Sequence, residues 1–193
     1  MRFSFNDVAG SGAPFPHLRI KNILSRDDAD LTLRWFKRGA PWKLTVAEFY
    51  EQYEFSLLDA ALAPEVHFLV DNKLVSAIAA ELKKSFKVEG ELELVEVSAH
   101  KLTHGQTIRI HNDYVETKES HRLLIQINDG WETSQGGLLM LFSSPAPESV
   151  QNVLLPIHGS GFAFEISPKS FHAVSSIISG ERYTLVYTFR RFM

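Results

Sequence analysis

The stretch "TIRIHNDY" (residues 107–114) carries the pattern on which the prediction of the fold depends. Apolar and polar residues alternate through it, as in a β-strand that buries one face. His111 and Asp113 stand two positions apart, so their side chains point to the same face of such a strand. A histidine and a carboxylate on one face can share a metal ion, whereas an isolated pair of this kind is equally consistent with a surface histidine beside a turn.

Short β-type runs separated by turn residues make up the chain from about residue 90 onward. The turns are rich in Gly, Pro, Asn, Asp and Ser, which favour reversals of the backbone. Eight evenly spaced antiparallel strands predict a double-stranded β-helix, or jelly roll, and an immunoglobulin-type sandwich is the rival fold. The predicted strands are residues 92–99, 107–112, 122–128, 137–142, 151–156, 161–167, 171–178 and 182–190.

The first ninety residues have a mixed and partly helical pattern. Residues 25–39 begin with Ser25 and an acidic turn, which is a helix-start signal, and residues 69–86 carry apolar residues at helical spacing. Residues 15–24 alternate as an opening strand, whereas the aromatic segment 40–65 shows no clear period. We therefore expect an α+β, mainly β, single domain over residues 1–193, with a helical support (1–90) and a jelly-roll core (91–193).

The composition is that of an ordinary globular protein and narrows the possible chemistry. The 193 residues are 45% hydrophobic and carry a net charge of -3, which gives no indication of a nucleic-acid partner. The apolar runs are too short to cross a bilayer, and the N-terminal stretch lacks the apolar core of a signal peptide, so we expect a cytoplasmic location and no membrane partner. Without cysteine, any metal must be held by His, Asp or Glu. The oligomeric state has no signal in the sequence.

Two later runs carry residues that complement His111 and Asp113. A jelly roll can bring its second and seventh strands together, which would place His172 beside the pair as a third metal ligand. Arg182 and Thr184 share one face of the eighth run, where a guanidinium beside a hydroxyl suits a small carboxylate. Two histidines and one carboxylate form the facial triad of non-haem iron, which leaves coordination positions open.

In these motifs the chain resembles the Fe(II)/2-oxoglutarate-dependent dioxygenases, in particular their prolyl-hydroxylase-like branch. The resemblance covers residues 95–191 and includes "LTHGQTIRIHNDY", "RLLIQINDGW", "GGLLMLF", "GSGFAFEISPKSFHAV" and "GERYTLVYTF". It implies that Fe(II) is bound by His111, Asp113 and His172, which act as the catalytic centre. It also implies that Arg182, with Thr184 as a second contact, binds the far carboxylate of 2-oxoglutarate, and that O2 is the oxidant.

Two positions depart from the family pattern. Leu102 stands where many prolyl hydroxylases carry a tyrosine, and Gln126 replaces a tyrosine at the end of a strand. Gln126 can still donate to a carboxylate, so the departures affect the substrate more than the co-substrate. Loops 114–121 and 143–151 and the aromatic segment are the candidate substrate-contacting regions, although core packing is the simpler role for aromatic residues. The individual candidates for substrate binding are Tyr114, Arg109, His121 and Trp131.

Arg109 has the same strand parity as His111, and it would face solvent instead if a bulge intervened. His100 and His104 lie four residues apart around a turn, where a second metal site is the less favoured interpretation. The remaining histidines, His17, His67 and His158, are interpreted as structural or surface residues.

The favoured function is therefore a hydroxylase that acts on a peptide, a protein side chain or an amino acid and releases succinate and CO2. A cupin-like metal-binding protein, either an isomerase or a sensor, is the alternative, but it would not need Arg182. A binding domain that has lost its chemistry is a third possibility, and such domains tend to lose one iron ligand.

Overall fold

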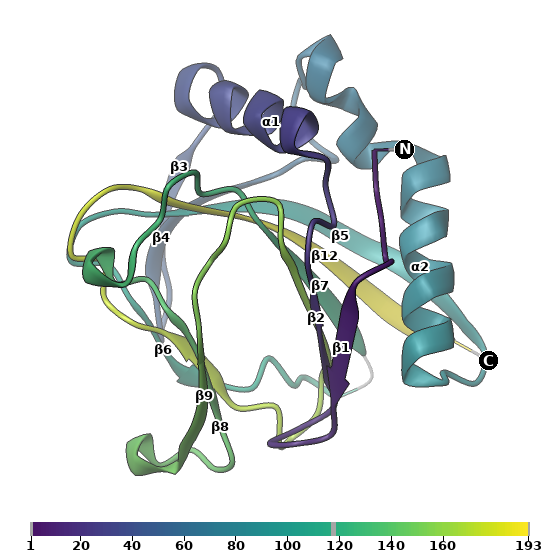
Figure 1. Cartoon of the computed structure of the whole chain (residues 1–193), viewed down its shortest axis with the longest axis vertical. Coiled ribbons are helices and arrows are strands. Elements are labelled where there is room, and N and C mark those ends of the chain that lie inside the picture. The colour runs from purple at the N-terminus through teal and green to yellow at the C-terminus, as the bar shows by residue number, and fades with distance from the viewer. Residues whose placement is uncertain (1, 117–118, 193) are drawn as a thin grey trace.

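The computed structural model describes residues 2–116 and 119–192 and shows two antiparallel β-sheets, with two helices packed on one face of the larger sheet (Figure 1). The helices are α1 (Arg26–Arg38) and α2 (Asn72–Phe86), and short 3-10 segments are η1 (Pro64–Val70), η2 (Thr133–Gln135) and η3 (Pro147–Ser149). The strands are β1 (Val8–Ser11), β2 (His17–Ile20), β3 (Lys43–Val46), β4 (Glu51–Ser56), β5 (Glu91–Leu102), β6 (Ile108–His111), β7 (His121–Gln126), β8 (Leu139–Phe142), β9 (Val150–Leu154), β10 (Gly161–Glu165), β11 (His172–Val174) and β12 (Arg182–Phe192).

The eight strands expected after residue 90 divide equally between the two sheets. β5, β7, β10 and β12 lie in the larger sheet, whose order is β1-β2-β10-β7-β12-β5-β4-β3. β6, β8, β9 and β11 form the smaller sheet in the order β6-β11-β8-β9. The second and seventh expected strands are neighbours in it, since β6 pairs with β11. The prediction of a jelly roll is therefore confirmed.

The N-terminal half contributes more to the larger sheet than the sequence indicated. Within the described residues, β1 to β4 extend this sheet at both edges, so residues 1–90 do more than support it with helices. The unassigned segment 40–65 supplies the hairpin β3–β4, which joins the sheet where Tyr53–Ser56 pairs with β5. The expected opening strand is shorter than predicted and becomes β2.

Both predicted helices are present, with the caps that their sequences provide. The Ser25 side chain accepts a hydrogen bond from the Asp28 backbone N–H at 3.2 Å and so begins α1. The Asp71 side chain does the same for α2, accepting from the Lys73 backbone N–H at 2.8 Å. Ile78 and Leu82 are the buried face of α2 and pack into the core under the larger sheet.

β12 has two chemically different faces. Its odd-numbered residues, from Tyr183 to Phe189, are buried in the apolar core shared with the helices. Its even-numbered residues face the other way, into a cavity on the side of the smaller sheet, and they are Arg182, Thr184, Val186 and Thr188. The register of this one strand therefore decides which side chains reach the cavity.

The start of β12 is fixed by the side chain of Asn128, which is 3% exposed. Its amide oxygen accepts from the Tyr183 backbone N–H at 2.6 Å, and its amide nitrogen donates to the Tyr183 carbonyl at 3.0 Å. The amide thus pairs with Tyr183 as a neighbouring strand would, and it holds the backbone between Arg182 and Thr184.

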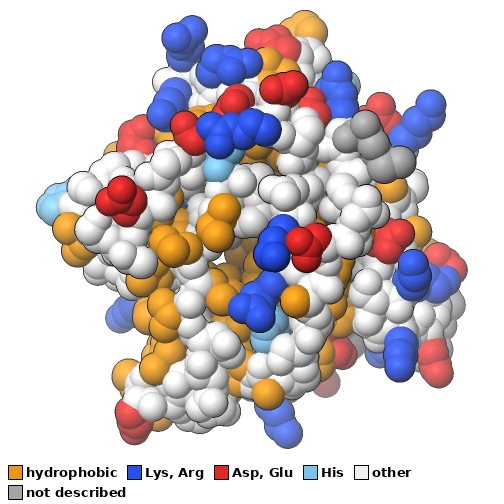
Figure 2. Space-filling view, in the orientation of Figure 1, with side chains coloured by type: hydrophobic (Ala, Val, Ile, Leu, Met, Phe, Trp, Pro, Cys, Tyr) orange, Lys and Arg blue, Asp and Glu red, His pale blue; other side chains and the backbone are white. Residues whose placement is uncertain are grey.

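Acidic and basic side chains are interspersed on the face shown in Figure 2, consistent with the small net charge. Among the described residues, none of the helices has the length and apolarity needed to cross a membrane.

We expect Asn128→Ala to lower the free energy of unfolding by about 1–3 kcal/mol, because the backbone N–H of Tyr183 loses its partner and the Tyr183 carbonyl keeps only the Ile127 N–H. Urea denaturation followed by circular dichroism measures the change. Asn6→Ala, at an exposed position, is the matched control and should change stability little. Equal stability of the two variants would contradict the role assigned to Asn128.

Candidate functional site

Three metal-ligating side chains meet at one end of the smaller sheet. His111 ends β6, Asp113 follows it, and His172 begins β11, directly opposite His111 in the strand pairing. The Asp113 carboxylate lies between the two rings, with Oδ1 3.3 Å from Nε2 of His111 and Oδ2 3.2 Å from Nε2 of His172. One ligand atom from each residue lies within 4.8 Å of the others, so the three can bind a single ion.

Both histidines are held by backbone contacts that leave Nε2 free for a metal. Nδ1 of His111 lies 2.8 Å from the carbonyl of Arg109, and Nδ1 of His172 lies 2.8 Å from the carbonyl of Ser170. A carbonyl can only accept, so each Nδ1 carries the proton. Burial, reinforced by His111, lowers the pKa of His172 despite the opposing effect of Asp113, which favours the neutral ring that binds metal.

Asp113 has a backbone conformation that non-glycine residues rarely adopt, with φ at +58°. Aspartate tolerates this left-handed region better than most residues, and such strain is typical of functional sites. Burial acts to raise the pKa of Asp113, but the charge of Arg122 and the contacts with His172 and His111 outweigh it and hold the pKa well below its usual range. The carboxylate is therefore ionised and available as a ligand.

Arg122, on β7, supports the metal centre, a role that was not predicted from the sequence. Its Nη1 lies 2.8 Å from Oδ2 of Asp113, and its Nη2 donates to Oε2 of Glu119 at 2.6 Å. The contact with the guanidinium thus fixes the orientation of the Asp113 carboxylate. The one signal in the sequence was a charged residue at the first inward-facing position of a predicted strand.

A cavity of about 1150 Å³ opens beside the three ligands, and Arg182 lies in its wall. Arg182 is 3% exposed, and its Nη1 donates to Oγ1 of Thr184 at 2.8 Å. Its Nε and Nη2 are buried and have no hydrogen-bond partner among the described residues. Burial lowers the pKa of Arg182 to about 10, so the group stays charged near pH 7 and requires an anion.

The space around Arg182 depends on Gly137, at the loop that precedes β8. A Cβ on Gly137 would lie 2.9 Å from Cδ of Arg182 and 2.7 Å from Cδ1 of Ile177, and its φ is +65°. Glycine is therefore required here, both for the backbone conformation and for the close approach of Arg182.

Most of the residues expected at the site are brought together. His111, Asp113, His172, Arg182 and Thr184 all line the cavity. Gln126 is buried next to Thr184 and accepts from its Oγ1 at 3.2 Å, but it does not line the cavity. Tyr114 lines the cavity and is 41% exposed, as expected of a residue at its mouth.

Three of the expected substrate contacts lie elsewhere. The pairing of β6 with β11 shifts between Ile108 and His111, so Ile108 lines the cavity and Arg109 is exposed. This bulge breaks the parity on which the expectation for Arg109 rested. His121 is on the opposite face of β7 from Arg122, buried against Phe86 of α2.

Trp131 does not line the main cavity either. Its indole nitrogen donates to the carbonyl of Gly136 at 2.9 Å, and the ring borders a separate, smaller cavity. The aromatic segment instead brings Phe49 and Tyr50 to the main cavity, and the Phe49 ring stacks on His111 with 4.4 Å between ring centroids. Trp42 packs in the core against Phe55 and Tyr183.

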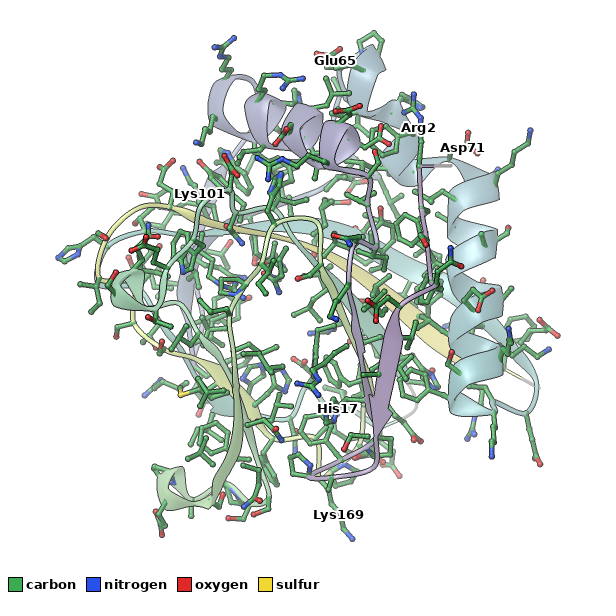
Figure 3. The ribbon with its side chains drawn as sticks, in the orientation of Figure 1. Arg2, His17, Glu65, Asp71, Lys101 and Lys169 are labelled. Carbon is green, nitrogen blue, oxygen red and sulfur yellow. The ribbon has the colours of Figure 1, made fainter. Side chains whose placement is uncertain are left out.

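Among the remaining histidines, His17, His104 and His158 each contact an acceptor atom. His17 lies on β2, where Nδ1 contacts the carbonyl of Phe15 at 2.9 Å (Figure 3). His158 contacts Asp30 at 3.0 Å, and His104 contacts the carbonyl of Ile178 at 2.7 Å, whereas His67 is exposed. His100 is the exception, because β5 extends far enough to place it in the cavity wall.

We expect Arg122→Gln to weaken divalent-metal binding by about tenfold, since a residue that orients a metal ligand typically contributes this much. Anaerobic titration with Co(II), followed by its d–d absorption, measures the affinity. Arg109→Gln removes an exposed arginine near the site and should leave the affinity unchanged. Equal affinities of wild type and Arg122→Gln would show that Asp113 is positioned without Arg122.

Comparison with known proteins agrees with this geometry. Residues 97–189 match the family model of the 2OG-Fe(II) oxygenase superfamily. Prolyl 3-hydroxylase OGFOD1 of Mus musculus is 27% identical over 188 residues, which cover 93% of this chain and 33% of that protein. The chain thus spans about a third of the length of the curated relatives it matches.

Solved structures share the fold. A Pseudomonas putida prolyl-4-hydroxylase superposes with a TM-score of 0.73 at 18% identity, over 91% of this chain and 92% of that chain. A Trichoplax adhaerens prolyl hydroxylase, solved with a hypoxia inducible factor peptide fragment, gives a TM-score of 0.73 at 14% identity, over 91% and 83% of the two chains. The family model thus identifies residues 97–189 as a 2OG-Fe(II) oxygenase domain, and in its relatives and its fold the chain is similar to prolyl hydroxylases.

Proposed function

We propose that this chain is an Fe(II)- and 2-oxoglutarate-dependent dioxygenase that hydroxylates a C–H bond of a peptide or protein residue. In this reaction 2-oxoglutarate, O2 and the substrate are converted to succinate, CO2 and the hydroxylated product. One oxygen atom of O2 enters succinate and the other enters the product. The observation that carries the proposal is a buried, partly unpaired arginine in the same cavity as two histidines and an aspartate.

Arg182 is the residue that favours a dicarboxylate co-substrate over metal chemistry alone. Its two unpaired N–H positions and the Thr184 hydroxyl face a cavity in which the described residues give Arg182 no carboxylate partner. A carboxylate bound there would form charge-assisted hydrogen bonds and remove the cost of a buried, unpaired charge. A cupin-like isomerase or sensor has no need of such an anchor and is not favoured.

His111, Asp113 and His172 would hold Fe(II), since two imidazoles and one carboxylate form the facial set of non-haem iron oxygenases. The metal and 2-oxoglutarate supply the oxidising power for an unactivated C–H bond. The protein keeps both rings in the ligating tautomer and keeps Asp113 ionised. Phe49, stacked on His111, limits the access of water to the ligand.

A peptidyl residue is the substrate class that the relatives support, because those reported above are prolyl hydroxylases by name and one was solved with a peptide. Tyr114 and Tyr50 line the cavity and would contact such a peptide.

We also propose a cytoplasmic location, since a chain without cysteine gains no disulfides from an oxidising compartment.

Under anaerobic conditions, Fe(II) and 2-oxoglutarate together should give a weak visible charge-transfer band that neither produces alone. His172→Ala should abolish the band, because a ligand nitrogen is lost. His104→Ala, which removes an exposed histidine bonded to a loop carbonyl, should keep it. A wild-type protein without the band, or a His172→Ala variant that retains it, would rule out the proposed iron chelate.

Arg182→Ala should weaken 2-oxoglutarate binding by about 100-fold, within the range expected when one partner of a buried ion pair is truncated. Co(II) affinity should stay within about twofold of wild type, because Arg182 is not a metal ligand. Arg109→Ala is the matched control for both measurements. An equal loss of metal and co-substrate affinity in Arg182→Ala would show that the arginine maintains the fold and does not anchor a ligand.

A further inference from the structure

A second unpaired group lies in the cavity wall, on β4. Gln52 is 2% exposed and lines the cavity together with Glu54. Its side-chain nitrogen donates to Oε2 of Glu54 at 2.7 Å. Its side-chain oxygen is buried and has no hydrogen-bond partner among the described residues. Because buried acceptors are normally satisfied, this oxygen indicates a donor that arrives with a ligand.

Among the described residues, Glu54 has no lysine or arginine as an ion-pair partner. Lys43 is its cross-strand neighbour on β3, but Lys43 is exposed and no ion pair within 4.0 Å joins the two among the described residues. Arg122 is engaged by Asp113 and Glu119. His100, opposite Glu54 on β5, lies with Nε2 4.0 Å from the Glu54 carboxylate.

His100 cannot neutralise Glu54, because burial, reinforced by the positive charges of Arg122 and Arg182, lowers the pKa of His100 to about 3. Its Nε2 lies 3.0 Å from Oγ of Ser98. Tyr50 is also close enough to sense the carboxylate, since burial, followed by the charge of Glu54, raises the pKa of Tyr50. The wall of β4 is thus a negatively charged surface with one unsatisfied acceptor beside the carboxylate.

The strand pairing relates this surface to the co-substrate anchor. Glu54 pairs with His100, His100 with Thr184, and Thr184 with Gln126, so the four residues form one row across the larger sheet. Two strand spacings of about 4.8 Å place the backbone of Glu54 about 10 Å from that of Thr184. The three metal ligands line the same cavity as Glu54, so a peptide whose target residue reaches the metal would extend a neighbouring side chain toward β4.

We infer that Gln52 and Glu54 form a subsite for a positively charged side chain, arginine or lysine, next to the hydroxylated residue of a peptide substrate. A guanidinium suits it best, because its fork of N–H donors can bond the Glu54 carboxylate and the Gln52 oxygen together. This inference rests on the proposed function, since it assigns specificity within the same cavity.

The test compares arginine with citrulline, which has nearly the same shape but is neutral, because a carbonyl oxygen replaces one nitrogen of the guanidinium. The probes are Ac-Gly-Arg-Pro-Gly-NH2 and Ac-Gly-Pro-Arg-Gly-NH2, each with its citrulline counterpart, titrated into protein loaded with Mn(II) and 2-oxoglutarate. In at least one register, the arginine peptide should bind about tenfold more tightly, the contribution of a charge-assisted pair. Equal binding of the two peptides in both registers, including no binding of either, overturns the inference.

Glu54→Gln keeps the shape of the side chain and should remove the preference for arginine. Glu51→Gln is the matched control, because it removes one negative charge from the same strand at an exposed position outside the cavity. Lys43→Met should leave the preference intact or increase it. A preference that exists only after Lys43 is removed would show that Lys43 already neutralises Glu54, and would overturn the inference.

Gln52→Met separates a binding role from a structural one. Because it removes a buried unsatisfied acceptor, the urea midpoint of the free protein should be unchanged or higher, while the preference for arginine falls. A lower midpoint with an unchanged preference would assign Gln52 to packing alone. The charge-transfer band of the Fe(II) complex, recorded on the same preparations, distinguishes failure of this subsite from failure of the proposed function.

Discussion

The register of β12 is the constraint on which the site depends. Shifted by one residue, the strand would place Arg182 and Thr184 in the apolar core and Tyr183 and Leu185 in the cavity. The apolar face anchors the strand through its packing with the helices, and the side chain of Asn128 fixes where the strand begins. The position of Arg182, the proposed co-substrate anchor, is thus determined by hydrophobic packing on the opposite face of the same strand.

Two arginines line one cavity, the buried Arg182 and the half-buried Arg122, and their neighbours separate their roles. Arg122 contacts two carboxylates, so its charge is already compensated and it can only position Asp113. Arg182 contacts a hydroxyl and otherwise has donors without a partner among the described residues, which is why we propose it as the anchor of a ligand carboxylate. The chemical type of the residue is the same, and the difference lies in which neighbours the fold supplies.

The sequence predicted the helices and the eight strands after residue 90 well, because capping residues and apolar periods are local signals. It also grouped His111, Asp113, His172 and Arg182, whose residue types are uncommon at strand positions facing a core. It failed where local parity breaks, at the bulge that turns Arg109 outward. It also failed on β4, since a strand facing a polar cavity has the same alternation as one facing solvent, and so Gln52 and Glu54 carried no distinguishing signal.

The composition of the cavity wall has a consequence for how long such a protein stays intact. The described residues that line the cavity include neither cysteine nor methionine, and the whole chain has only three methionines. Thioethers and thiols are the side chains most readily damaged by stray oxidants. An oxidant released by uncoupled turnover would therefore encounter aromatic rings such as Phe49 and Tyr50 before any sulfur atom. Oxidative damage should then accumulate slowly, as oxidation of these rings close to the metal.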